Sequence, residues 1–326
     1  MEIIPREYFE RMTMVQLRAF AKQQNWKRIY VWKSKRDLVE YIYVNARIAH
    51  IEQPHDIVNE VANMQIAADA PNAAEPAEDP RLLNSSICVT FGEQVENHHG
   101  MEMIGQLAEK GLSLDDLNRC MLYFNTLGKV TELHHLADPL VPPQFSDGAY
   151  VLIIRNAADP RLWNELIDLP VDTRVFMYGR VVNKHARHNL CFADFDQEPN
   201  YEAGKGRIIS FAHLPILQAM RELIGESTGI NNLLAEENYY YDITKCGVGY
   251  HGDLERRIVV AIRLGASLPI CYQWHLRNQS IGERKMFMLN HCDIYFMSDK
   301  AVGFDWKKSS IYTLRHAAGS RKFIDL

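Results

Sequence analysis

Two histidines and an aspartate have the types and spacing of a metal-binding triad. His251-Gly252-Asp253 places an imidazole and a carboxylate two residues apart, and His316 follows much later in the chain. On a strand these two side chains face the same side, so both can reach one ion. Two imidazoles and one carboxylate form a facial triad for non-haem Fe(II) that leaves coordination positions open for a bidentate co-substrate and O2. The residues therefore predict a ferrous site at His251, Asp253 and His316.

Other histidines of the chain are weaker candidates for metal ligands. His291 competes for the distal position, but it follows His251 too closely for a barrel, and we favour His316. The adjacent pairs at 98–99 and 134–135 have no carboxylate or cysteine at ligand spacing, so satisfied or solvent-facing imidazoles are expected there. A purely structural role for His-Gly-Asp, without metal, stays open as the alternative.

Composition limits the class of protein. The chain has 326 residues, 47% of them hydrophobic and 24% charged, which predicts a globular protein with either one large domain or a catalytic core and a small appendage. The net charge of -5 argues against unspecific binding of polyanions by the whole surface. The six cysteines form no CxxC pair, which is typical of buried thiols in a reduced intracellular protein. We see no secretory signal and no apolar run long enough to span a membrane.

Charge and composition divide the chain into four segments. Residues 1–50 are basic and read as two helices joined by a turn, and residues 51–82 form an acidic, Ala/Pro-rich stretch that predicts a flexible linker. Residues 83–148 mix strand and helix patterns, including a helix at Leu114–Leu127, and should pack on the core. Residues 149–326 carry the strand-rich catalytic domain.

The N-terminal segment MVQLRAFAKQQNWKRIYVWKSKRDLVEYI resembles the SAP or Rho-N-terminal type of small nucleic-acid-binding module. In those families a Leu-x-x-x-Ala/Leu-Lys helix precedes a Lys-x-x-Leu-Val/Ile-x-x-Ile helix. The resemblance implies phosphate contact through basic side chains. The alternative is an amphipathic hairpin that packs on the core or on a partner. The basic candidates are Lys27, Arg28, Lys33, Lys35 and Arg36.

Short apolar runs dominate the second half of the chain. AYVLII, RVFMYG, RIISF, RIVVAIRLG, MFMLN, DIYFM and IYTL are rich in β-branched and aromatic residues, and one dominant helix is expected at Leu214–Ile224. This pattern predicts an α+β protein whose catalytic core is a double-stranded β-helix (jelly roll) with flanking helices and a small N-terminal helical module. GxGxxG is missing, so a dinucleotide-binding fold has no support.

The string NYYYDITKCGVGYHGDLERRIVVAIRLG, residues 238–265, resembles the AlkB-like branch of the 2-oxoglutarate/Fe(II) dioxygenases. The family pattern is Asn-x-Tyr, then His-x-Asp, then a strand ending in Leu-Gly. The resemblance covers about residues 149–322. GRVVNKHARHNLCFAD and IYTLRHAAG are similar to strings in AlkB-like proteins of large DNA viruses and microbial eukaryotes. The resemblance to the AlkB-like dioxygenases implies Fe(II) and 2-oxoglutarate as cofactors, with Asn238 and Tyr240 in contact with the co-substrate.

The sequence departs from this family after the distal histidine. AlkB-like enzymes carry an Arg-x-Asn-x-Thr-x-Arg strand there, whose arginine binds 2-oxoglutarate, and this motif is missing. An insertion, DWKKSS, also precedes His316. If the strand continues, Lys322 shares a face with His316 and is the favoured replacement. The other candidate cations are Arg321, Arg315 and Arg263.

The hairpin YGRVVNKHARHNLCFAD resembles the substrate-facing hairpin of the family. Its arginines and aromatic residue suit a flipped base beside phosphate, although ordinary surface or ion-pair roles stay open. The expected function is hydroxylation or oxidative demethylation of a base in DNA or RNA. The expected location is the nucleus or cytoplasm, which includes those of an infected host cell. The alternatives are a protein or small-molecule hydroxylase and a non-catalytic nucleic-acid-binding protein with a degenerate barrel. No feature indicates the oligomeric state. The substrate candidates are Tyr178, Arg180, Arg187 and Asn189.

Overall fold

The computed structural model describes residues 79–325 together with Leu17 and Val39. The chain divides into two compact units, Met1–Ala77 and Glu78–Leu326. Apart from these two residues, the structure does not describe the basic module expected at 1–50. The linker up to residue 78 also lies outside the described residues. The same holds for the five basic candidates of the module.

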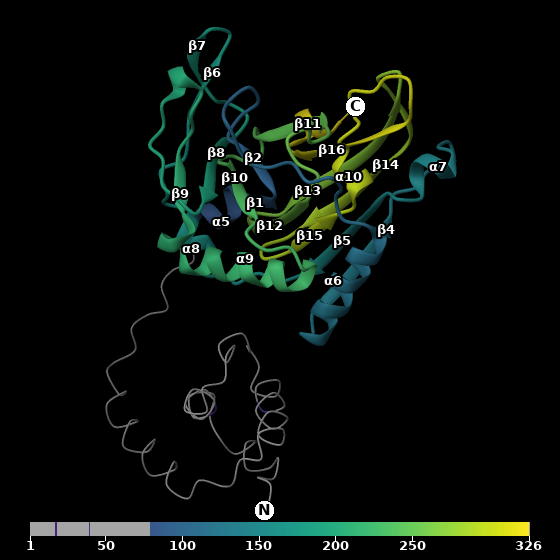
Figure 1. The fold of residues 1–326 in the computed structure, drawn as a ribbon, viewed down its shortest axis with the longest axis horizontal. Helices are drawn as coiled ribbons and strands as arrows, with labels where there is room; N and C mark the ends of the chain where they lie inside the picture. Colours follow the sequence, from purple (N-terminus) through teal and green to yellow (C-terminus); the bar gives the residue numbers. More distant parts are fainter. Residues whose placement is uncertain (1–16, 18–38, 40–78, 326) are drawn as a thin grey trace, which may run out of the picture. The chain divides into compact units, whose positions relative to one another are not determined.

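An eight-stranded sheet is the largest element of the second unit (Figure 1). Its strands pair antiparallel except for β8 with β9. In spatial order the strands are β4 (Val130–His135), β5 (Tyr150–Arg155), β15 (Ile294–Met297), β12 (Val259–Gly265), β1 (Ser86–Gly92), β10 (Leu234–Tyr240), β8 (His188–Ala193) and β9 (Ile208–Ser210). The first strand along the described chain therefore lies in the interior of this sheet.

A four-stranded antiparallel sheet faces the large one. Its order is β11 (Gly247–His251), β16 (Thr313–Gly319), β13 (Leu268–Leu276) and β14 (Gln279–Leu289). Two small hairpins complete the strands: β2 (Gln94–Glu96) with β3 (Met103–Gly105), and β6 (Arg174–Met177) with β7 (Arg180–Asn183).

Two long helices cover the face of the large sheet that is turned away from the small one (Figure 1). They are α6 (Leu114–Thr126) and α9 (Pro215–Thr228). Ser113 caps α6 by accepting a hydrogen bond from the Asp116 amide, and the Asp116 carboxylate accepts one from the Ser113 amide. This reciprocal cap explains why the helix begins where the sequence predicted it. The short helices are α5 (Arg81–Asn84), α7 (Pro143–Ser146), α8 (Leu162–Leu166), α10 (Asp299–Val302), α11 (Arg321–Ile324), η1 (Tyr201–Ala203) and η2 (Phe211–His213).

Alternation along the central strands produces two cores. On β1, Ile87, Val89 and Phe91 pack with the two long helices, whereas Cys88 belongs to the cluster between the sheets. The strands predicted in the second half of the chain are confirmed, as are the helices predicted at Leu114–Leu127 and Leu214–Ile224. All six cysteines are buried, as expected. The described residues form a mixed α+β structure with about 39% strand, and their sheets do not close into a barrel. None of the described helices combines the length and apolarity that a membrane crossing needs.

Candidate metal centre

The three residues of the predicted triad meet at one point. β11 ends at His251, its partner strand β16 places His316 directly opposite, and Asp253 follows two residues after His251. One ligand atom from each residue lies within 4.8 Å of the others, and no second group of this kind occurs among the described residues. Strand pairing thus brings the distal histidine to the His-x-Asp motif, as the spacing predicted.

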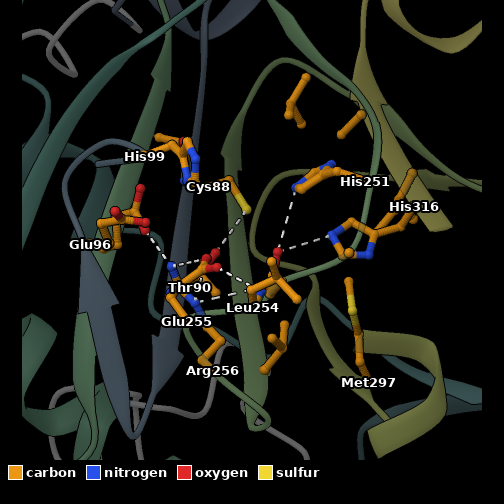
Figure 2. Close-up of a pocket in the computed structure, with 18 of the residues that line it drawn as sticks. Cys88, Thr90, Glu96, His99, His251, Leu254, Glu255, Arg256, Met297 and His316 are labelled. Carbon is orange, nitrogen blue, oxygen red and sulfur yellow. Dashed lines mark hydrogen bonds and ion pairs between the residues drawn. The ribbon is translucent and has the colours of Figure 1, made fainter. Parts of the chain in front are cut away.

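Both imidazoles approach the aspartate, and Figure 2 shows His251 and His316 next to each other. Oδ1 of Asp253 lies 3.5 Å from Nε2 of His251 and 3.6 Å from Nε2 of His316. Nδ1 of His251 lies 2.8 Å from the carbonyl oxygen of Gly249, to which it can donate. Such a bond orients the ring and leaves the Nε2 lone pair for an ion, as in most metal-binding histidines.

The protonation states suit metal ligands. Burial, followed by the neighbouring His316, lowers the pKa of His251 to about 4. Burial alone would raise the pKa of Asp253, but the hydrogen bond and charge of His316 and the charge of Arg256 hold it well below its usual value. A neutral imidazole and an ionised carboxylate are the forms that bind metal ions.

Gly252 is needed between the two ligands. A Cβ on this residue would lie 2.1 Å from the carbonyl oxygen of Gly303. The amide of Asp253 also donates to the carbonyl of Val302. The segment after α10 therefore fixes the backbone between the imidazole and the carboxylate.

The triad opens into a cavity of about 390 Å³ between the two sheets. In Figure 2, His251 and His316 lie on one side of this pocket and Glu96 and His99 on the other. Strands β1, β10, β12 and β15 of the large sheet contribute residues to its wall. The pocket is large enough for a small acid beside a bound ion and a part of a second substrate.

Comparison with known proteins gives one relationship. No family model matches the chain. It is 48% identical over 249 residues to "Uncharacterized protein R156" of Acanthamoeba polyphaga mimivirus, an alignment that covers 74% of this chain and 98% of the viral protein. The chain belongs to the family of this mimivirus protein.

In this member of the R156 family, a buried arginine faces the triad across the pocket. Strand pairing places Asn238, Cys88 and Arg263 in one row on β10, β1 and β12. Arg263 is fully buried and lines the pocket, and none of its three guanidinium nitrogens has a hydrogen-bond partner in the described part of the chain. Its guanidinium lies 5.5 Å from the ring centre of Tyr240. An unpaired buried cation is costly, so this wall is suited to an anion.

The cations favoured from the sequence lie elsewhere. β16 ends at Gly319, where φ is +119°, and Ser320 begins helix α11, so the strand expected to reach Lys322 is interrupted. Arg321 and Lys322 are exposed and do not line the pocket. Arg315 is also outside the lining, and it donates to Oδ1 of Asn278 at 2.7 Å. Of the four cations considered, Arg263 alone faces the triad.

The predicted substrate residues divide into two groups. Arg187 lines the pocket, and its Nε donates to Oδ1 of Asn238. Asn189 donates to the same oxygen at 3.0 Å and lines a neighbouring cavity of about 250 Å³. Tyr178 and Arg180 are exposed at the turn of the β6–β7 hairpin and line neither cavity.

Several pocket residues were not predicted from the sequence. His98 and His99 line the pocket, and Nε2 of His98 is buried without a hydrogen-bond partner in the described residues. Trp306 and Lys307, from the insertion before β16, line it as well. His291 does not join the triad, because its Nδ1 accepts a hydrogen bond from the Gly265 amide. The adjacent pair 98–99 was the available signal for His98 and His99, but no nearby carboxylate marked it as part of a site.

Proposed function

We propose that this protein is an Fe(II)/2-oxoglutarate-dependent oxygenase of the AlkB-like type that hydroxylates or oxidatively demethylates a nucleic-acid base. The observation that carries the proposal is the meeting of His251, Asp253 and His316 in a pocket between two sheets. Two histidines and one carboxylate are the ligand set of non-haem Fe(II) oxygenases. The hydrogen bond of His251 to a backbone carbonyl fits the same role.

The strand arrangement supports a double-stranded β-helix as the core. Seven strands, β10 to β16, follow one another along the chain, and β1 is the eighth. They form two four-stranded layers, β10-β1-β12-β15 and β11-β16-β13-β14. A jelly roll has eight strands in two such sheets. In this interpretation β1 occupies the place of the strand that the AlkB-like resemblance expects after His316.

Arg263 would bind the co-substrate. 2-Oxoglutarate carries a second carboxylate far from the end that would approach the metal, and a guanidinium pairs well with a carboxylate. Arg263 lies on the wall opposite the triad, and its guanidinium has no hydrogen-bond partner among the described residues. Tyr240 and Asn238 lie on the same wall, in agreement with the co-substrate contacts that the resemblance implies.

Ferrous iron and 2-oxoglutarate would supply the activation of O2 that hydroxylates a C–H bond, with succinate and CO2 as the other products. The protein would hold the ion through Nε2 of each histidine and the Asp253 carboxylate. The wall around the metal group would exclude bulk water and orient the substrate. Hydroxylation of an N-methyl group gives a hemiaminal that releases formaldehyde, whereas other C–H bonds give a stable alcohol.

Positive charge in the segment of the β6–β7 hairpin, which ends near the pocket residue Arg187, favours a nucleic-acid substrate. No acidic residue occurs between Asp172 and Asp194, a segment that contains the β6–β7 hairpin and four Lys or Arg residues. Tyr178 at its turn is 88% exposed. An exposed aromatic ring among cations suits base stacking beside phosphate.

Turnover with defined oligonucleotides tests the proposal. The anaerobically iron-loaded full chain is mixed with 2-oxoglutarate, O2 and methylated or unmodified oligonucleotides, and succinate and base masses are measured. We expect oligonucleotide-dependent succinate and a mass change of one base. His251→Ala should lose iron and both signals, while His213→Ala, which changes an exposed histidine paired with Asp196, should retain them. Equal activity of His251→Ala and wild type would contradict the proposal.

A protein hydroxylase is the second candidate. Glu96 and Glu255 line the pocket, and burial is the main cause that raises the pKa of each. Buried carboxylates of this kind would suit a basic side chain of a peptide. Succinate release that depends on basic peptides, and is unaffected by oligonucleotides, would favour this function.

A further inference from the structure

The insertion before His316 forms a fixed ledge beside the triad. We use the name ledge for residues 305–308, which lie between α10 and β16. A Cβ on Gly252 would lie 2.8 Å from Cδ1 of Trp306, so the indole rests against the backbone between the two triad ligands. Trp306 and Lys307 both line the pocket.

Several contacts hold the ledge in place. Nζ of Lys300 lies 2.8 Å from Oδ2 of Asp305 and also donates to the carbonyl of Tyr312. The guanidinium of Arg315 lies 5.2 Å from the Trp306 ring centre and donates to the Trp306 carbonyl. A ledge held in this way presents its side chains to a ligand with little loss of conformational entropy.

The polar groups of the ledge have capacity for a ligand. Nε1 of Trp306 is buried and has no hydrogen-bond partner within residues 79–325. An indole N–H can only donate, so its complement is an acceptor oxygen. Lys307 and Lys308 are exposed. The ledge therefore offers one indole N–H without a partner in the described residues and, at Lys307, one ammonium group in the pocket lining.

Cations also occur on the other side of the pocket. Arg187 lines the mouth near the β6–β7 hairpin, and Figure 1 shows that hairpin and α10 at opposite sides of the pocket strands. The acidic residues Glu96 and Glu255 lie in the pocket. A ligand that satisfies all these groups has negative charge at both ends of the mouth and hydrogen-bond donors in between.

We infer that the ledge is a phosphate-binding subsite, and that a single nucleic-acid strand crosses the pocket mouth from the hairpin to the ledge. Lys307 pairs with a phosphodiester, and Trp306 Nε1 donates to an oxygen of the same nucleotide. The base between the two phosphate contacts then enters the pocket toward the triad. This inference deepens the proposed function and rests on it for the nature of the substrate.

Salt-dependent binding tests the subsite without turnover. A fluorescent single-stranded oligonucleotide is titrated with the full chain by anisotropy at several salt concentrations. Lys307→Gln should weaken binding of every sequence and reduce the slope of log affinity against log salt by about one. Lys322→Gln is the matched control, because each of these exposed lysines has its Nζ 5.5 Å from a neighbouring aromatic ring centre, but Lys322 lies outside the pocket. A slope for Lys307→Gln equal to that of the control would overturn the inference.

Trp306→Phe tests the directed donor. It retains an aromatic ring and removes the indole N–H, so oligonucleotide affinity should fall about tenfold while the unfolding temperature changes little. Unchanged affinity would show that the N–H does not contact the strand. The phosphate assignment would also be overturned if binding of an acidic peptide depended on Lys307 and binding of the oligonucleotide did not.

The two proposals fail separately. Iron content and succinate release are measured on the same variants. A Lys307-dependent slope without any succinate would retain the subsite and contradict the oxygenase. Oligonucleotide-dependent succinate release that is unchanged in Lys307→Gln would support the oxygenase and contradict the subsite.

Discussion

Each face of the eight-stranded sheet buries a charged side chain with polar atoms that have no hydrogen-bond partner in the described residues, and the two side chains differ in how their charge can be accommodated. Glu237, 1% exposed, lies on β10 beside Val89 and Leu190, on the face that packs against the long helices. Arg263 lies on β12 and faces the pocket. Oε2 of Glu237 and all three guanidinium nitrogens of Arg263 have no hydrogen-bond partner in the described residues.

A carboxylate can lose its charge by binding a proton, but a guanidinium cannot. Burial raises the pKa of Glu237 to about 8, so this side chain is mostly neutral at pH 7. Arginine remains charged at any pH that a protein tolerates. The helix face therefore tolerates its buried acid unaided, whereas Arg263 keeps its charge on the pocket face, where a bound anion would compensate it. Unpaired charge marks a ligand site only where protonation cannot remove it.

The largest expected effect is on the helix face. Phe124 of α6 is fully buried and packs edge-on against Phe296, with ring centres 5.9 Å apart. Phe124→Ala should lower the free energy of unfolding by about 3–5 kcal/mol, because it leaves a cavity in the core. Denaturant unfolding measures this, and the KM for 2-oxoglutarate should not change. A large rise of that KM would contradict the separation of the two faces.

Arg263→Met should stabilise the fold and weaken binding of 2-oxoglutarate, the opposite of what is expected for Phe124→Ala. It removes an unpaired buried charge at similar volume, so the unfolding temperature without ligand should rise. Binding of 2-oxoglutarate should weaken by about 2–5 kcal/mol, measured by calorimetry of the iron-free protein. The wild type should gain thermal stability from 2-oxoglutarate, and the variant should not. A variant that binds 2-oxoglutarate normally would remove Arg263 from the site.

Glu237→Gln should change how stability depends on pH. The folded pKa of Glu237, about 8, lies above the ordinary value of 4.5, so the folded state holds its proton more tightly. The wild type should therefore lose stability as pH rises from about 4.5 to 8. Glu237→Gln should lack this loss and be more stable by about 1–3 kcal/mol at pH 8. Parallel pH profiles of the two proteins, measured by thermal unfolding, would contradict the buried-acid interpretation.

The smallest expected effect is at the start of α6. Ser113→Ala removes the side chain that caps this helix and should cost about 1 kcal/mol of stability. Ser113→Asp keeps a capping oxygen and serves as the control. Neither change should affect binding in the pocket, which lies on the other face of the sheet. Equal destabilisation by both variants would show that the cap is not the cause.

Local patterns in the sequence predicted the parts that depend on near neighbours. Short apolar runs rich in β-branched and aromatic residues located β5, β12 and β15, and Ser113 marked the start of α6. The spacing of His251 and Asp253 predicted one face of a strand. His316 was placed correctly as their neighbour, because few other histidines could return from a late strand.

The pocket wall that carries Arg263 could not be predicted in this way. Arg263 joins Asn238 in one wall because β1 pairs with both β10 and β12, and these segments are far apart in the chain. Lys322 was favoured on the assumption that β16 continues, and Gly319 with Ser320 ends that strand. Strand order and strand ends are set by tertiary packing, and a single residue of difference reverses which side chains face a site.

The position of β1 has a consequence for synthesis of the protein. This strand emerges from the ribosome first among the described strands, yet both of its hydrogen-bonding neighbours are made much later. Until then Ile87, Val89 and Phe91 have no partner strand to shield them, and contacts between distant segments form slowly. We expect nascent chains that stop before β12 to aggregate or recruit chaperones, and full-length chains to acquire their central strand last.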